Sequence, residues 1–150
     1  ELIRSKVELP PEENISWGSE EFTSNPYHRE RLIVKTSQGH MVRSKSEAII
    51  GSALESYQLP YRYECALQIG NKNYFPDFTI KDPKTGEIII WEHFGMMDDP
   101  EYSSNAKNKI SMYLDSGYYP LKNIIFTYET KEMPLDAKMV NELIMMRFIW

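Results

Sequence analysis

A chain of 150 residues with 41% hydrophobic and 26% charged side chains is long enough to bury the core of one domain, and this composition excludes an extended disordered polypeptide. No apolar run approaches the roughly 20 residues that a membrane-spanning helix requires, and residues 1–8 lack the basic and apolar regions of a signal peptide. Together with the single cysteine, Cys65, these features predict a cytoplasmic protein without an internal disulfide and without membrane contacts.

The net charge of −5 argues against a nucleic-acid partner, but the charge is unevenly distributed. Residues 1–25 hold six acidic and two basic side chains, so the rest of the chain is nearly neutral. Between His28 and Lys45, a basic segment carries five Lys or Arg residues against the single acid Glu30. We predict that these five side chains contact nucleic-acid phosphates, the alternative being a solvated charged face. They are Arg29, Arg31, Lys35, Arg43 and Lys45.

Residues 1–26 contain Pro10-Pro11, several glutamates and no sustained periodicity, which is typical of an irregular N-terminal arm or extension. Residues 27–150 predict one domain, and because the chain begins without methionine we expect a longer protein with an additional domain. This domain begins with two short extended runs, 31–35 and 40–43, joined by a hairpin turn in which Gly39 supplies a positive φ.

The first helix is predicted over residues 44–57, and Leu59-Pro60 ends it. Ser44 and Glu47 match a capping box, in which the serine side chain caps the helix. Glu47 also lies in line with the apolar stripe of this helix, so its carboxylate either only caps the helix or faces the sheet and takes part in function. The apolar stripe consists of Ile50, Leu54 and Tyr57.

Strands are predicted next at 61–69, 74–80 and 87–94, the first two joined by a turn at 70–73. The run Ile88-Ile89-Ile90-Trp91 is typical of a central strand covered on both faces.

Asp99, Pro100 and Glu101 have the order of an N-cap, a first-turn proline and a first-turn acid, and they open a helix that ends near Ser116. A strand at 123–128 and a helix at 135–148 complete the chain. The order αβββαβα predicts an α/β (α+β) fold in which a central mixed β-sheet is flanked by helices on both faces.

Two acids interrupt predicted strands where apolar side chains are normally buried: Asp77 in 74–80 and Glu92 in 87–94. Burying an unpaired carboxylate costs several kcal/mol unless a cation or a donor compensates it. Carboxylates on adjacent strands are rigid oxygen ligands of the kind that Mg²⁺ prefers. The pair therefore predicts a shared metal ion, the alternative being that each acid meets an arginine or a backbone donor.

Pro76-Asp77, followed fifteen residues later by Glu92-His93 and preceded by a helical Glu47, resembles the PD-(D/E)XK nuclease superfamily. The resemblance covers residues 43–130 and includes the strings Arg43-Ser44-Lys45-Ser46-Glu47, Tyr74-Phe75-Pro76-Asp77-Phe78 and Trp91-Glu92-His93-Phe94-Gly95, which are similar to uncharacterised bacterial members.

This resemblance implies a restriction-endonuclease-like core and Mg²⁺-dependent hydrolysis of DNA phosphodiester bonds, with Mn²⁺ as a substitute metal. It implies that Asp77, Glu92 and the His93 carbonyl bind the metal and that Glu47 assists directly or through water.

The chain departs from the superfamily pattern in the third motif, where Glu92-His93-Phe94 stands in place of Glu-x-Lys. In some members the lysine comes from the following helix, which here carries Lys107 and Lys109. Both border the apolar stripe of that helix, and both could be solvated; position in the resembling sequences favours Lys109 as the catalytic lysine. His93 is a second candidate, because histidine titrates near neutrality, although strand alternation directs its side chain away from the face of Glu92.

The missing lysine keeps open a second reading, a catalytically inactive nucleic-acid-binding module with a nuclease fold. A structural or protein-interaction domain is a third reading, which fits the acidic net charge but leaves the two buried acids unexplained. Many nucleases of this fold act as dimers, and the apolar C-terminal residues Phe148-Ile149-Trp150 are the candidate surface for a homodimer.

Overall fold

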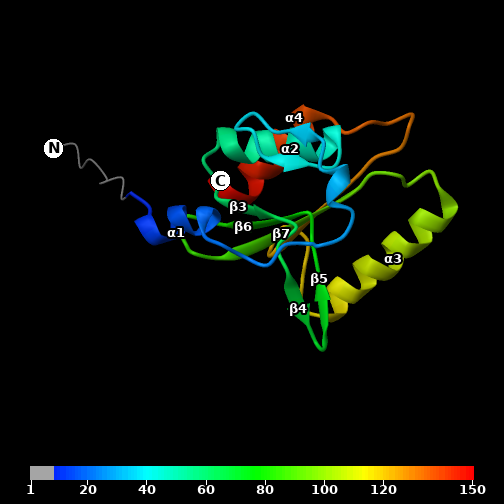
Figure 1. Ribbon diagram of the computed structural model, residues 1–150, viewed down its shortest axis with the longest axis horizontal. Helices are drawn as coiled ribbons and strands as arrows, with labels where there is room; N and C mark the ends of the chain where they lie inside the picture. The colour runs from blue at the N-terminus through cyan, green and yellow to red at the C-terminus, as the bar shows by residue number, and fades with distance from the viewer. Residues whose placement is uncertain (1–8) are drawn as a thin grey trace.

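The computed structural model describes residues 9–150, so the first part of the predicted N-terminal arm lies outside the described residues. At its centre is a four-stranded mixed sheet with the strand order β3-β6-β7-β8 (Figure 1). The pairs β3–β6 and β6–β7 are antiparallel, and β7–β8 is parallel. The strands are β3 (Tyr61–Tyr63), β6 (Phe78–Lys81), β7 (Ile88–Phe94) and β8 (Ile124–Tyr128).

Helices cover both faces of this sheet. On one face, α2 (Lys45–Ser56) and α4 (Ala137–Ile144) pack over the main core, which includes Trp91. On the other face, α3 (Pro100–Asp115) contributes Tyr113 to a smaller cluster around Ile90 (Figure 1). The order α2-β3-β6-β7-α3-β8-α4 confirms the predicted mixed sheet with flanking helices.

The predicted helix starts are confirmed by their caps. The Ser44 hydroxyl accepts a hydrogen bond from the Glu47 amide at 3.1 Å, and the Asp99 carboxylate accepts one from the Tyr102 amide at 2.8 Å. These bonds satisfy amides that have no partner within the first turn of a helix. None of the helices between residues 9 and 150 is long and apolar enough to cross a membrane.

The C-terminal helix differs from the prediction in two ways. It begins at Ala137, and after Ile144 it continues as a π-helix, η3 (Met145–Ile149). Phe148 belongs to the main core, with 6% of its surface exposed, so the expectation that it is an exposed apolar residue is wrong. Ile149 and Trp150 are exposed and remain candidates for an interface.

The two strands predicted at 61–69 and 74–80 are each broken. Their outer parts form a separate hairpin of β4 (Leu67–Ile69) and β5 (Lys72–Tyr74), and Asp77 precedes β6 instead of lying within a strand. The breaks have local causes: Glu64 adopts a left-handed φ of 48°, and Pro76 has no amide hydrogen for a sheet ladder.

The segment before α2 contains only short elements. The predicted hairpin turn is confirmed, with Gly39 at φ 89°. None of the buried hydrophobic side chains among the described residues comes from residues 9–26, but this arm is docked on the sheet edge, where Arg62 lies 4.0 Å above the Trp17 ring. The elements are α1 (Glu12–Ser16), η1 (Trp17–Ser19), η2 (Arg29–Arg31), β1 (Val34–Lys35) and β2 (Met41–Val42).

Candidate active site

A cavity of about 290 Å³ lies between α3 and the C-terminal half of β7. Alternation along β7 directs Ile90 and Glu92 to the α3 face of the sheet, and Asp77 enters from the segment that precedes β6. On α3, the cavity is lined by residues spaced three and four positions apart, which places them on one side of the helix. The lining residues are Asp77, Glu92, His93, Phe94, Tyr102, Asn105, Ala106 and Lys109.

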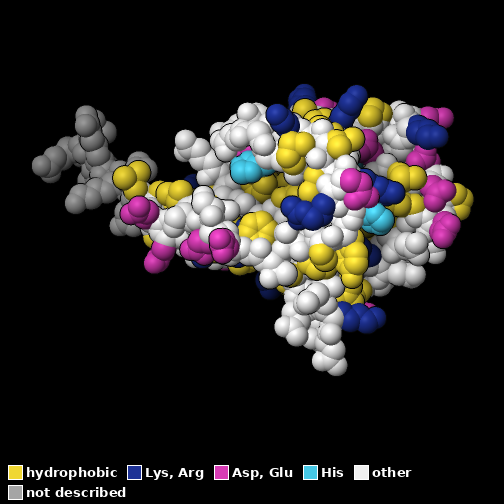
Figure 2. All heavy atoms as spheres, in the orientation of Figure 1, with side chains coloured by type: hydrophobic (Ala, Val, Ile, Leu, Met, Phe, Trp, Pro, Cys, Tyr) yellow, Lys and Arg dark blue, Asp and Glu magenta, His cyan; other side chains and the backbone are white. Residues whose placement is uncertain are grey.

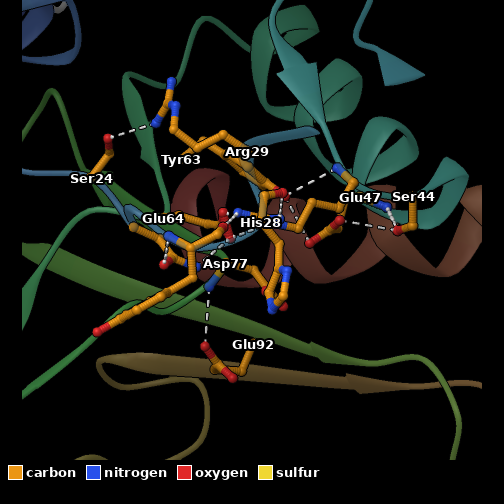
Figure 3. A network of polar contacts seen from close by, with 12 residues as sticks. Ser24, His28, Arg29, Ser44, Glu47, Tyr63, Glu64, Asp77 and Glu92 are labelled. Carbon is orange, nitrogen blue, oxygen red and sulfur yellow. Dashed lines mark hydrogen bonds and ion pairs between the residues drawn. The ribbon is translucent and has the colours of Figure 1, made fainter. Parts of the chain in front are cut away.

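The structure brings Asp77 and Glu92 together through reciprocal backbone contacts. The Asp77 amide donates a hydrogen bond to Glu92 Oε1 at 3.0 Å (Figure 3), and the His93 amide donates to Asp77 Oδ2 at 2.7 Å. Glu92 is therefore held by the backbone amide of Asp77, and Asp77 is held by the backbone amide of His93, the residue after Glu92. One oxygen of each acid thus accepts a hydrogen bond from a backbone amide, as expected if the acids were compensated by backbone donors instead of a metal. These neutral donors do not cancel the negative charge of the pair.

Lys109 is the cation that meets this pair. Its Nζ lies 2.7 Å from Glu92 Oε2, and 36% of its side chain is exposed against 2% for Glu92. Periodicity alone did not separate Lys109 from Lys107; in the structure Lys107 is exposed and does not line the cavity. The structure therefore brings Lys109, and not Lys107, to the carboxylate pair.

Negative charge exceeds positive charge in the site. Burial, followed by the charges of Glu92 and Glu47, raises the pKa of Asp77 well above its ordinary value. Burial also raises the pKa of Glu92, although Lys109 partly opposes that effect. Burial alone would lower the pKa of Lys109, but the Glu92 carboxylate, with smaller contributions from Asp77 and Tyr102, outweighs burial and raises that pKa. One ammonium group therefore does not compensate the carboxylates around it.

Glu47 lies close enough for its charge to raise the pKa of Asp77, but its carboxylate has hydrogen-bond partners of its own. Its carboxylate accepts hydrogen bonds from the Tyr63 hydroxyl and the Ser44 hydroxyl, each at 3.1 Å (Figure 3). Burial raises the pKa of Glu47, and these two hydrogen bonds partly oppose the shift. Glu47 therefore lies near the first turn of α2 as a capping residue would, while its carboxylate faces the sheet, as the functional interpretation expected.

The donor set fits a metal bound through two carboxylates and water better than a closed protein cage. Within residues 9–150, no three His, Cys, Asp or Glu side chains are gathered as a ready-made metal site, so Glu47 does not join Asp77 and Glu92 in one ligand group. Mg²⁺ is usually held by one or two carboxylates and keeps several waters. The Tyr113 hydroxyl is buried and has no hydrogen-bond partner among residues 9–150, and the charge of Glu92 adds to burial in raising the pKa of Tyr113.

The imidazole of His93 does not share the face of Glu92. Its Nδ1 lies 2.8 Å from the Thr127 hydroxyl, and its Nε2 lies 2.6 Å from Glu129 Oε1. The Ser46 hydroxyl, at the start of α2, also hydrogen-bonds Glu129 Oε1. His93 therefore contributes its backbone amide to the site, while its side chain braces the opposite face, as strand alternation predicted.

The basic segment is divided in the structure. The Nε of Arg43 lies 2.8 Å from both carboxylate oxygens of Glu64, and its terminal nitrogens donate to the carbonyls of His28 at 2.6 Å and Tyr27 at 2.8 Å. Arg43 is thus occupied within the protein, which corrects its prediction as a phosphate contact. The four other basic residues are exposed, namely Arg29, Arg31, Lys35 and Lys45.

Figure 2 shows that charge is unevenly distributed over this face of the molecule. Acidic side chains gather over the N-terminal segment around α1 and again at the right-hand edge of the view, and most of the Lys and Arg side chains of this view lie over the α2 and α4 half of the molecule. The acidic net charge therefore does not apply uniformly to the surface, as the sequence distribution indicated.

Sequence reasoning missed two residues that hold the site. The Tyr63 hydroxyl donates to Glu47 and accepts from the Arg43 amide at 3.1 Å. Glu129 connects β8 to His93 and to Ser46 of α2. A signal for Glu129 was available, because it directly follows β8, and the carboxyl ends of parallel strands meet at one edge of a sheet.

Comparison with known proteins assigns no family to the chain. No family model matches it, and no solved structure matches it. A protein of Methanocaldococcus jannaschii that is described as uncharacterised is 28% identical over 123 residues. The match covers 81% of this chain but 10% of that protein, so the chain spans about a tenth of the length of this relative.

Proposed function

We propose that this chain is a metal-dependent nuclease domain that hydrolyses DNA phosphodiester bonds on a restriction-endonuclease-like core. The observation that carries the proposal is the excess of carboxylate charge in an open cavity: Asp77 and Glu92 line it together, and within residues 9–150 Lys109 is the one cationic side chain that pairs with them. A divalent cation would supply the missing positive charge. The order α2-β3-β6-β7-α3-β8 also agrees with the αβββαβ order of that core.

Each residue of the site has a role in this proposal. Asp77 and Glu92 would hold Mg²⁺ or Mn²⁺, with the His93 carbonyl as a further ligand and Glu47 assisting through water. The bound ion would act as a Lewis acid toward the phosphate. Lys109 lies where an ammonium group can orient an attacking water and offset charge on the phosphate. The exposed residues Arg29, Arg31, Lys35 and Lys45 would contact the DNA backbone.

The test is cleavage of duplex and single-stranded DNA with Mg²⁺ or Mn²⁺ by the wild-type chain and by Asp77→Asn and Glu92→Gln. Both substitutions preserve side-chain volume while removing the charge that would bind the metal, so we expect cleavage to fall more than about 100-fold. Glu132→Gln is the matched control, because Glu132 is exposed and lies outside the cavity. Full cleavage by both site variants would refute the proposal.

A catalytically inactive nucleic-acid-binding module is the second candidate. It is favoured by one observation: Lys109 already occupies Glu92 Oε2, the atom that a metal would also need. Such a module would bind DNA with an affinity that falls steeply with salt concentration, but it would cleave nothing with either metal. Measuring binding and cleavage on the same samples separates the two candidates.

A further inference from the structure

The β4–β5 hairpin stands off the central sheet as a separate unit (Figure 1). Its strands are joined by a two-residue turn in which Gly70 has a φ of 61°, the conformation that favours glycine. Apart from Gly70 and its two chain neighbours, no atom of the described residues lies within 4 Å of the position that a β-carbon on Gly70 would take. The tip of the hairpin therefore lies in open space.

The base of the hairpin lies beside the carboxylate pair. Leu67 and Ile69 pack against the cluster that contains Ile90, on the face of β7 that also carries Glu92. Ile90 and Glu92 are two residues apart, about 6.6 Å along a strand. At the point where the hairpin leaves the sheet, the Glu64 amide donates to the Asp77 carbonyl at 3.0 Å. The hairpin thus begins and ends next to the proposed active site.

The outward face of the hairpin carries unpaired amide side chains. Gln68 and Asn73 are directly opposite each other in the register and are both exposed, and Asn71 is exposed in the turn. Leu67 and Ile69 alternate with Gln68 and take the inward face. Among residues 9–150, none of these three amide side chains has a hydrogen-bond partner. Their donors and acceptors are therefore free to bind a ligand.

The charge of the hairpin suits a polyanion. Residues 65–76 include Lys72 and no acid, in a chain that has 22 acidic residues, and acids flank this stretch on both sides as Glu64 and Asp77. An acid on this surface would repel DNA phosphates, whereas amides and lysine do not. Along the chain, the nearest acids on either side of the hairpin are therefore Glu64 and Asp77, at its base.

We propose that the β4–β5 hairpin enters the major groove of duplex DNA and that Gln68 and Asn73 read base edges there. This inference rests on the proposed function in that it takes DNA as the substrate. The major groove of B-form DNA is about 12 Å wide and admits a two-stranded β-ribbon, and Asn and Gln pair with the N6 and N7 atoms of adenine. The hairpin makes the domain a sequence-selective binder of duplexes that contain adenine near the cleavage site.

The experiment selects bound sequences from a pool of DNA duplexes with a randomised centre, using the wild-type chain with Ca²⁺ in place of Mg²⁺. We expect enrichment of a motif that contains adenine. Gln68→Ala and Asn73→Ala should each weaken binding of the enriched duplex about 5- to 100-fold while leaving binding of an unrelated duplex unchanged. Gln38→Ala, which removes an exposed amide from the β1–β2 turn, should bind like the wild type.

Absence of enrichment by the wild-type chain would overturn the inference, as would a motif that both hairpin variants retain. Equal binding of single-stranded DNA or of duplex RNA would also overturn it, because the major groove of A-form RNA is too narrow for side chains to read. Circular dichroism of the variants checks that they are folded. Cleavage by the wild-type chain is measured in a separate assay, with Asp77→Asn as the inactive control. If the wild type shows hairpin-dependent enrichment but no cleavage, the nuclease proposal is refuted and the inference about the hairpin is not.

Discussion

At the scale of single residues, the site combines groups that the fold would be more stable without. Burial raises the pKa values of Asp77 and Glu92, and the charge of Glu92 adds to the rise at Asp77, which means that the folded protein disfavours their charged forms. Perturbed carboxylates of this kind concentrate at functional sites, where charge is kept for chemistry or for binding a cation. Lys109 limits the cost by pairing with Glu92.

Removing Lys109 should therefore destabilise the protein. Lys109→Ala leaves the Glu92 side chain, which is 2% exposed, without its cation, so we expect the free energy of unfolding near pH 8 to fall by about 1 to 2 kcal/mol. This loss is smaller than for a fully buried pair, because 36% of the lysine side chain is exposed to screening by solvent.

The measurement is urea unfolding of Lys109→Ala beside Lys107→Ala, an exposed lysine of the same helix. The control should change stability by less than about 0.5 kcal/mol. Equal effects of the two substitutions would show that the ion pair with Glu92 contributes no special stability.

At this scale the sequence singled out Asp77 and Glu92, because acids within predicted strands are a local feature. Periodicity left Lys107 and Lys109 equally placed, and only the family resemblance favoured Lys109. The sequence did not identify Tyr63 or Glu129, whose roles depend on partners 16 and 36 residues away along the chain. It also assigned Arg43 to the surface, since nothing near position 43 predicts that Glu64 turns back toward it through a left-handed backbone.

At the scale of secondary-structure elements, β7 carries the site on one face and its brace on the other. Glu129 joins two elements and a loop, since its carboxylate binds His93 of β7, Ser46 of α2 and, at 3.1 Å, the Leu135 amide in the loop before α4. The hydrogen bonds from Ser46 and His93 lower the pKa of Glu129 despite its burial. Ser46 and His93 are each adjacent to a site acid, so this brace fixes Glu47 relative to Glu92.

Glu129→Ala should loosen that arrangement. It leaves His93 Nε2, Ser46 and the Leu135 amide without their acceptor, and we expect a loss of about 2 to 3 kcal/mol in the free energy of unfolding. Chemical unfolding of this variant beside the exposed control Glu132→Ala measures the effect. A loss no larger than that of the control would mean that the brace does not couple α2 to β7.

The helices and the central strands were predictable from the sequence at this scale, but the breaks in the two strands predicted at 61–69 and 74–80 were not. Ser44 and Asp99 are strong local start signals, and both cap their helices as expected. The hydrophobic pattern from 61 to 80 predicted one hairpin of two continuous strands, whereas the chain bends at Glu64 and at Pro76 and forms two separate pairings. Periodicity reports apolar faces, but it does not report where a strand changes sheet.

At the scale of the whole molecule, stability should depend on pH through Asp77. Its pKa is raised in the folded state, so the unfolded chain loses this proton at a lower pH than the folded protein does. The contribution of Asp77 to stability is therefore fully present below its ordinary pKa of 3.8 and is lost as the pH rises through the raised value.

Asp77→Asn removes this titration without changing the size of the side chain. In the absence of divalent metal, the wild-type stability minus that of Asp77→Asn should decrease as the pH rises above about 4. Urea unfolding of both proteins between pH 4 and pH 8 measures this difference, with the exposed residue Asp115 substituted by Asn as the control. A difference that stays constant or increases with pH would contradict the assigned direction.

The most direct measurement of the central claim is calorimetric titration of Mn²⁺ into the folded wild-type chain and into Asp77→Asn, Glu92→Gln and Glu132→Gln. We predict that the wild type and Glu132→Gln bind Mn²⁺ and that both site variants lose this binding. If the folded wild type binds no Mn²⁺, or if Asp77→Asn binds it equally well, the carboxylate pair is not a metal site and the proposed nuclease mechanism is wrong.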